Sequence, residues 1–233
     1  MPQSMLWLAR RSLTWRLRSS TLSVSYKTLK DAVEATATLV DRRSRFIAQI
    51  KAVSSEHEAK LFVQEVSSRY PDARHNVFAW VLADGRERCS DDGEPQKTAG
   101  MPTLEELRAA GLANICCVVT RYFGGTLLGP GGLVRAYSSS TRQAIIAAKE
   151  AGNIVTMRLV RPVTCVVPYV LYGRVLRLVA ECSGKVLDTV FSDDVQMNCI
   201  FLVGQESRFS KAVGELAAGE DLCTIAEPRF GEL

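Results

Sequence analysis

The sequence predicts an α+β protein with two consecutive domains, and three observations support this fold class. Segments with strand and helix periodicity alternate along the chain. A break at Gly152 and Asn153 separates two such blocks. The chain has 233 residues, of which 47% are hydrophobic, so each block has enough apolar residues for a core of its own. We expect the first domain over residues 25–152 and the second over residues 158–233.

The first block contains strands and helices whose bounds follow from local signals. Alternating apolar residues mark strands, and Ser55 with Glu58 marks the start of a helix as a capping box. Strands are expected over residues 32–40, 46–53, 77–83 and 115–120, and helices over 55–70, 103–111 and 133–149. The polar stretch 86–100 is expected to be a loop, and Thr103 with Glu106 to open the short helix that follows it.

The second block has a simpler and more specific order. Strands are expected over residues 163–167, 186–191, 195–203 and 222–229, and helices over 169–182 and 205–218. Strand–helix–strand–strand–helix–strand within about seventy residues is the order of a ferredoxin-like βαββαβ domain.

Charge is distributed unevenly along the chain. Residues 1–30 contain six lysines and arginines and no acid, residues 31–150 are balanced, and residues 151–233 have a net charge of −2. The overall charge of +4 therefore does not indicate binding of nucleic acid through overall positive charge. We exclude residues 1–24 from the fold. This acid-free, arginine- and serine-rich segment is expected to be a disordered extension, and a mitochondrial transit peptide is the alternative.

Several classes of protein and site are excluded by the apolar runs and the cysteines. No apolar run reaches the roughly 18 residues that a membrane-spanning helix needs, so no membrane contact is expected. The seven cysteines form no Cys-x-x-Cys pair, and the two histidines complete no familiar zinc spacing. We expect neither a metal nor a cofactor. The cysteines are expected to be reduced and buried, with Cys116 and Cys117 on opposite faces of one strand.

The most unusual segment runs from Arg121 to Arg135 and reads RYFGGTLLGPGGLVR. Its five glycines permit positive φ angles and close approach of a ligand to the backbone. Free N–H groups at the start of the following helix can hold an anion. The residues from 107 to 149 include no acid, and Arg135 and Arg142 share one helix face with two serines. The opposite face, which includes Val134 and Tyr137, is expected to face the core.

This combination of arginines, glycines and aromatic residues indicates a candidate phosphate-backbone site. A tight turn beside a solvated helix face is the alternative. The candidate residues for binding nucleic acid or an anion are Arg121, Tyr122, Gly124, Gly125, Gly129, Gly131, Gly132, Arg135 and Arg142.

A second candidate site is the loop SDDGEP, with Ser90, Asp91, Asp92 and Glu94. Paired carboxylates beside a serine can ligate a hard cation or act as acid and base, but Asp-Asp-Gly is also common in turns. We favour a structural turn and assign no catalytic residue. Arg121 has an alternative role here, because it can pair with a carboxylate of this loop and hold the two motifs together.

These motifs resemble the IMPACT domain family in its bacterial two-domain arrangement. The resemblance rests on ARHNVFAW, ERCSDDGEPQKTAGMP and VVTRYFGGTLLGPGGLVRAYSSS. It implies that the first domain is similar to α+β sandwiches of ribosomal and translation-factor proteins, and that the second is similar to domain five of elongation factor G. Eukaryotic members of the family regulate translation by competing for an activator of an initiation-factor kinase. The two-domain members are thought to bind nucleic acid or ribosomes, with no established catalysis.

We therefore expect a cytoplasmic, translation-linked protein that binds RNA or the ribosome without catalysis. Two alternatives stay open. One is a hydrolase that works between the SDDGEP loop and the glycine-rich turn. The other is a regulator that uses the same surface to bind a translation-control protein. A mitochondrial location applies if the N-terminal segment is a transit peptide, and the oligomeric state is left open.

Overall fold

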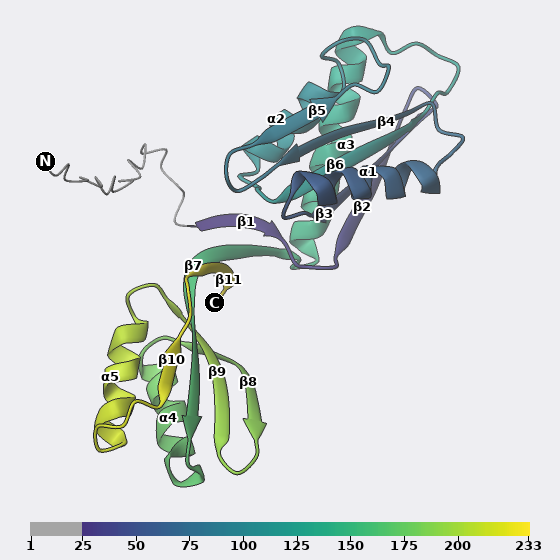
Figure 1. The fold of residues 1–233 in the computed structure, drawn as a ribbon. Coiled ribbons are helices and arrows are strands. Elements are labelled where there is room, and N and C mark those ends of the chain that lie inside the picture. The colour runs from purple at the N-terminus through teal and green to yellow at the C-terminus, as the bar shows by residue number, and fades with distance from the viewer. Residues whose placement is uncertain (1–24) are drawn as a thin grey trace, which may run out of the picture.

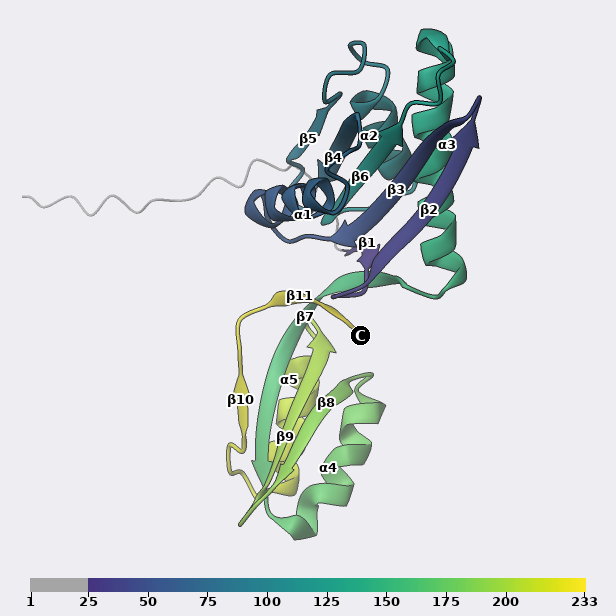
Figure 2. The same cartoon turned by 90° about the vertical axis from the view of Figure 1, so that its right-hand side faces the viewer.

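The computed structural model describes residues 25–233, and the expected N-terminal extension lies outside these residues. The described residues form two α+β bodies, each with its own antiparallel sheet, joined through strands β1 (Ser25–Leu29) and β7 (Ile154–Val167) (Figures 1 and 2). The predicted fold class is therefore confirmed. Among residues 25–233, no helix is long and apolar enough to cross a membrane.

The first sheet has the strand order β2-β3-β6-β4-β5, with helices on both faces (Figure 2). Helix α1 covers one face, and α2 and α3 cover the other. The elements are β2 (Glu34–Asp41), β3 (Ser44–Ala52), α1 (Glu56–Arg69), β4 (His75–Val81), β5 (Glu87–Ser90), α2 (Gly100–Ala109), β6 (Ile115–Tyr122) and α3 (Gly129–Glu150).

The central strand β6 is buried on both faces, and this explains its continuous apolar sequence. Cys116 packs on the α1 side and Cys117 on the α2–α3 side, so the predicted opposite orientation is confirmed. Burial raises the pKa of the Cys117 thiol to about 12, which makes it unreactive.

The second sheet belongs to a ferredoxin-like domain. Its core strands have the order β10-β7-β9-β8, and both helices pack on one face of the sheet. The elements are β7 (Ile154–Val167), α4 (Tyr169–Glu181), β8 (Lys185–Phe191), β9 (Val195–Leu202), α5 (Glu206–Leu216), β10 (Cys223–Ile225) and β11 (Arg229–Glu232). The last predicted strand, over residues 222–229, is in fact two short strands, β10 and β11, that pair with different parts of β7. Pro228, which has no N–H to donate, lies between them.

In the second sheet, one strand was not predicted and another is longer than predicted. Strand β1 (Ser25–Leu29) pairs antiparallel with the first residues of β7, so the start of the described chain joins the second sheet. Strand β7 also begins at Ile154 rather than 163 and runs through the segment expected to separate the domains. Both differences come from pairing between residues far apart in sequence, which local periodicity does not report.

In the first domain, the Ser55 cap is confirmed, because its Oγ accepts a hydrogen bond from the Glu58 amide at 3.2 Å. The loop expected over 86–100 instead contains β5. Helix α2 begins at Gly100, so Thr103 is not its cap, and the Thr103 hydroxyl donates to the Ala99 carbonyl inside the first turn. Helix α3 begins at Gly129, four residues before the expected start.

Candidate functional site

The glycine-rich turn packs directly against the β2–β3 hairpin. The Gly124 amide donates to the Ser44 hydroxyl at 3.1 Å. A Cβ at Gly124 would lie 2.0 Å from the carbonyl carbon of Arg43, so no other residue fits at this close approach. Gly125 and Gly129 have positive φ angles of +82° and +72°. Gly131 and Gly132 lie in the first turn of α3. The glycines thus shape both the turn and the helix start.

Five exposed arginines lie around this turn, and we call this part of the surface the arginine end. It consists of Arg42, Arg43, Arg45, Arg74 and Arg135. Arg42 and Arg43 donate to the Leu127 carbonyl and the Thr126 hydroxyl of the turn. None of the five forms an ion pair with another described residue.

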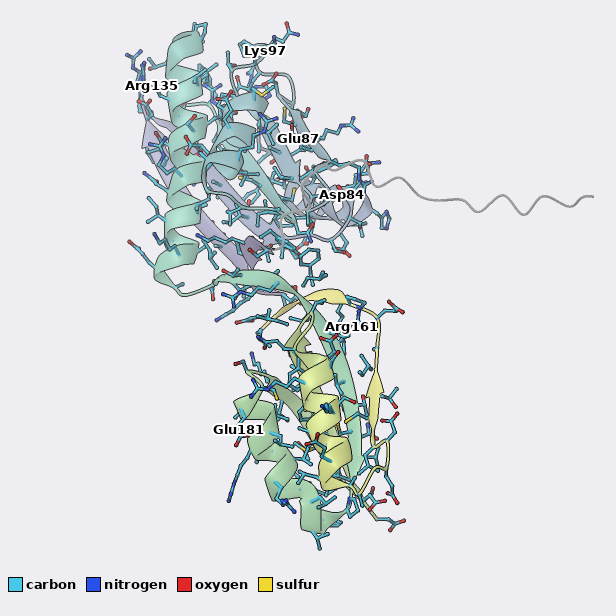
Figure 3. All side chains as sticks on the ribbon, turned by 90° about the vertical axis from the view of Figure 1, so that its left-hand side faces the viewer. Asp84, Glu87, Lys97, Arg135, Arg161 and Glu181 are labelled. Carbon is cyan, nitrogen blue, oxygen red and sulfur yellow. The ribbon has the colours of Figure 1, made fainter. Side chains whose placement is uncertain are left out.

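The other three arginines approach the turn from neighbouring elements. The Arg45 guanidinium lies 4.5 Å from the centre of the Tyr122 ring, and the Arg74 amide donates to the Arg121 carbonyl. A Cβ at Gly131 would lie 3.8 Å from Arg135 Nη1, which places this guanidinium over the start of α3 (Figure 3). The sequence pattern identified Arg135 but not the other four arginines. The pair of arginines in the short turn between two predicted strands was the one available signal.

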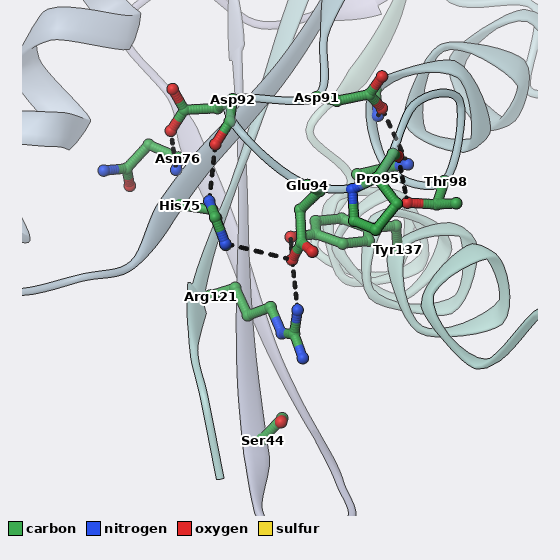
Figure 4. Close-up of polar contacts among 12 residues, drawn as sticks. Ser44, His75, Asn76, Asp91, Asp92, Glu94, Pro95, Thr98, Arg121 and Tyr137 are labelled. Atoms are coloured by element: carbon green, nitrogen blue, oxygen red, sulfur yellow. Dashed lines mark hydrogen bonds and ion pairs between the residues drawn. The ribbon is translucent and has the colours of Figure 1, made fainter. Parts of the chain in front are cut away.

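Arg121 is not on this surface. It is 5% exposed, and its Nη1 donates to Glu94 Oε1 at 2.5 Å. The same oxygen accepts from the Tyr137 hydroxyl at 2.8 Å and lies 4.0 Å from His75 Nε2 (Figure 4). Burial, together with the Glu94 charge, raises the pKa of Tyr137, which therefore stays a neutral donor. Arg121 thus joins the glycine turn to the SDDGEP loop, which we call the acidic loop from here on. This is the alternative role that the sequence allowed for Arg121.

The carboxylates of the acidic loop are used by the backbone. Asp91 accepts from the amides of Lys97, Ala99 and Gly100 at 2.8, 3.1 and 2.8 Å. It therefore satisfies the start of α2, which has no cap from its own N-terminal residue. Asp92 accepts from the Asn76 amide at 2.6 Å (Figure 4). Ser90 Oγ accepts from the Asp92 amide at 3.2 Å. Among residues 25–233, no three His, Cys, Asp or Glu side chains are grouped to hold a metal ion.

The remaining predicted site residues differ in their availability. Arg142 is exposed, but its Nε and Nη2 donate to the Glu106 carboxylate at 3.0 and 2.6 Å. The ion pair offsets the charge that was expected to contact phosphates. The Tyr122 hydroxyl donates to Asp72 at 2.8 Å. Val134, expected in the core, is 37% exposed, whereas Tyr137 is fully buried.

Comparisons with known proteins cover both domains. The sequence matches the Impact N-terminal domain over residues 42–145 and a domain of unknown function, DUF1949, over residues 165–220. It is 35% identical to IMPACT family member YvyE of Bacillus subtilis (strain 168) over 198 residues, which cover 84% of this chain and 88% of YvyE. It is 33% identical to IMPACT family member YigZ of Escherichia coli (strain K12), with 76% and 87% covered. A crystal structure of a hypothetical protein covers 90% of this chain and 97% of its own, with 28% identity and a TM-score of 0.56.

Proposed function

Because the chain belongs to the IMPACT family, in its two-domain form, we propose that it is a cytoplasmic, translation-linked protein that binds RNA or the ribosome. The surface proposed for binding is the arginine end with the glycine turn. The single observation that carries the proposal is that five exposed guanidinium groups surround one turn without carboxylate partners among the described residues. A regulatory role in translation is what the family resemblance implies.

The chemistry of these side chains suits a phosphate backbone. Guanidinium groups bind phosphate oxygens through charge-assisted, often bidentate hydrogen bonds, and each such contact releases counterions from the nucleic acid. Contacts to phosphate position a protein without reading base sequence. The exposed Phe123 and the Tyr122 ring beside Arg45 add flat surfaces on which unpaired bases can stack. We therefore expect binding that depends strongly on salt and weakly on sequence.

A hydrolase is the less favoured function, because the oxygens it would use are already occupied. Asp91 and Asp92 accept backbone hydrogen bonds, and Glu94 accepts from Arg121 and Tyr137. We therefore propose a function without catalysis and keep a protein partner as an outcome of the binding test.

Two arginines on helix α3 provide a matched comparison. Arg135 has no ion-pair partner among residues 25–233, whereas Arg142 is paired with Glu106. We expect Arg135→Ala to weaken binding to single-stranded RNA and to ribosomes and to reduce the salt dependence. Arg142→Ala, with the same loss of charge, should change both less. Equal effects of the two substitutions, or no RNA and no ribosome binding by the wild type, would contradict the proposal. In the second case a protein partner would become the leading explanation of this surface.

A further inference from the structure

A cavity of about 390 Å³ lies between the glycine turn and the acidic loop, next to the arginine end. Its polar wall consists of Arg74, His75, Glu94 and Arg121, together with backbone at the start of α3. Its apolar wall consists of Pro95, Phe123, Leu127, Leu128, Pro130 and Leu133. Pockets for small molecules span roughly 300–1,000 Å³ and combine apolar walls with a few convergent polar groups. This cavity therefore suits a group the size of a nucleotide and is too small for a duplex.

Arg121 is the buried cation of the wall, and one edge of its guanidinium is unused. Its side chain is 6% exposed, and Nε has no hydrogen-bond partner among the described residues. Figure 4 shows Nη1 directed at Glu94 and the opposite side of the guanidinium directed away from it. A buried donor without a partner costs free energy, which an acceptor oxygen from a ligand would recover. The Nε–Nη2 edge is a planar fork that matches two oxygens of one phosphate or carboxylate.

The start of α3 provides a second set of donors at the same cavity. Gly129 and Pro130 line the cavity together with Arg121. The amides of Gly129 and Gly131 precede the first hydrogen bond within the helix. No side chain among the described residues caps this helix, and its first turn has no acid. The N-terminus of a helix of 22 residues attracts an anion through these free amides and its partial positive charge. Arg121 and the helix start therefore line the same cavity, where both can donate to one anion.

We propose that this cavity binds the phosphate monoester at the end of a nucleic-acid chain. The inference rests on the proposed function, because the exposed arginines around the cavity favour a polyanion over a peptide carboxylate. The phosphate lies between the free edge of Arg121 and the start of α3. Phe123, which is 42% exposed, stacks on the terminal base. A free nucleotide carries the same phosphate chemistry, so the experiment has to separate the two sources.

The test compares one short single-stranded RNA with a 5′-phosphate, with a 3′-phosphate and with hydroxyl groups at both ends. Binding to the full chain is measured by fluorescence anisotropy, with free adenosine monophosphate and inorganic phosphate as competitors. We expect one phosphorylated end to bind about tenfold more tightly than the hydroxyl end, the effect of one strong charge-assisted contact. Free adenosine monophosphate should compete more weakly than the phosphorylated RNA, because the arginine end contacts only the chain.

Variants separate the cavity from the surface around it. Arg121→Lys removes the fork and retains a positive charge beside Glu94, and Phe123→Ala removes an exposed ring in case the first variant does not fold. Arg121→Lys should abolish the preference for the phosphorylated end. Phe123→Ala should reduce this preference, because without the stacked base the chain end is held less firmly over the cavity. Arg45→Ala, whose side chain does not line the cavity, should weaken all three RNAs equally and keep the preference.

The outcomes distinguish this inference from the function on which it rests. RNA binding with no preference for a phosphorylated end would overturn the inference and leave the proposed function standing. Failure of every RNA to bind would overturn the inference, and together with a failure to bind ribosomes it would contradict the proposed function. If no RNA binds, adenosine monophosphate presents the ligand's chemistry in isolation: a rise in melting temperature on its addition, absent in Phe123→Ala, would support a phosphate monoester in the cavity. The same result would overturn the end of a nucleic-acid chain as the source of that phosphate. Binding of a peptide with a free C-terminal carboxylate, with no phosphate ligand bound, would overturn the inference as well.

Discussion

Replacing Arg42 with Asn and Arg43 with Gly should remove two charges from the arginine end and leave its hairpin intact. Both residues have positive φ angles, 45° and 67°, in the two-residue turn between β2 and β3. Such a turn with two left-handed residues is the type I′ hairpin, for which Asn-Gly is the preferred sequence. The variant loses two exposed side-chain hydrogen bonds to the glycine turn, but it also loses the strain of two long side chains in the left-handed region. We expect the free energy of unfolding to change by less than about 1 kcal/mol.

The effect on binding follows from counterion release. Each phosphate contact to a single strand contributes about −0.7 to the slope of log K against log salt, so five arginines give a slope near −3.5. Removing two contacts should bring the slope to about −2.1. If the two proteins bind equally at about 1 M salt, the variant should bind roughly 25-fold more weakly than the wild type at about 0.1 M. At about 0.2 M the difference should be roughly ninefold.

The assay is fluorescence anisotropy of a labelled single-stranded RNA over a series of salt concentrations. The matched control is the double substitution Arg86→Asn and Arg88→Asn, which removes the same charge from the β4–β5 hairpin. Strand β4 begins opposite Arg121 and ends opposite Ile115. The β4–β5 hairpin therefore lies at the end of the sheet away from the glycine-rich turn. Identical slopes for the wild type and the Arg42/Arg43 variant would show that these two arginines do not contact phosphates. So would an equal loss in the control, because binding would then reflect net charge alone.

Three further substitutions and one fragment test the structure itself. Asp91→Asn keeps one acceptor oxygen and should cost about 1–2 kcal/mol in a denaturant titration, and a hydrolytic activity lost in this variant would instead promote the enzyme hypothesis. Glu94→Gln leaves a buried cation unpaired and should cost about 3–5 kcal/mol, whereas an unchanged melting temperature would show that the pair is dispensable. Residues 158–233 alone should melt cooperatively, and a fragment without a transition would contradict the predicted domain boundary. The hydrogen bond from Arg108 lowers the pKa of Glu87, so this group stabilises the fold above its ordinary pKa, and the contribution is lost as pH falls through the lowered value. The stability difference between wild type and Glu87→Gln should therefore shrink on acidification, and a constant difference would contradict the assigned pair.

The sequence determined the order of elements wherever a segment buries one face by itself. Apolar residues at helical spacing predicted α1, and a short run bounded by turns predicted β6, with Cys116 and Cys117 on opposite faces. The ferredoxin-like order also followed from local periodicity, because each of its helices and long strands carries its own apolar pattern. The glycine-rich turn was identified for the same reason, since its composition alone sets it apart.

The tertiary structure decided which charges are free. Arg121 and Glu94 are 27 positions apart in the chain and Arg142 and Glu106 are 36 apart, yet each pair is in direct contact. The segment from 107 to 149 contains no acidic residue, and it therefore indicated a basic surface. A count of charges along the chain does not include carboxylates that neighbouring elements bring into contact with it. Arg42 lies beside the glycine turn only because β3 pairs with β6. Periodicity reports whether a side chain faces the core, whereas a charge is neutralised through space over a few ångströms, by whichever element the fold brings near.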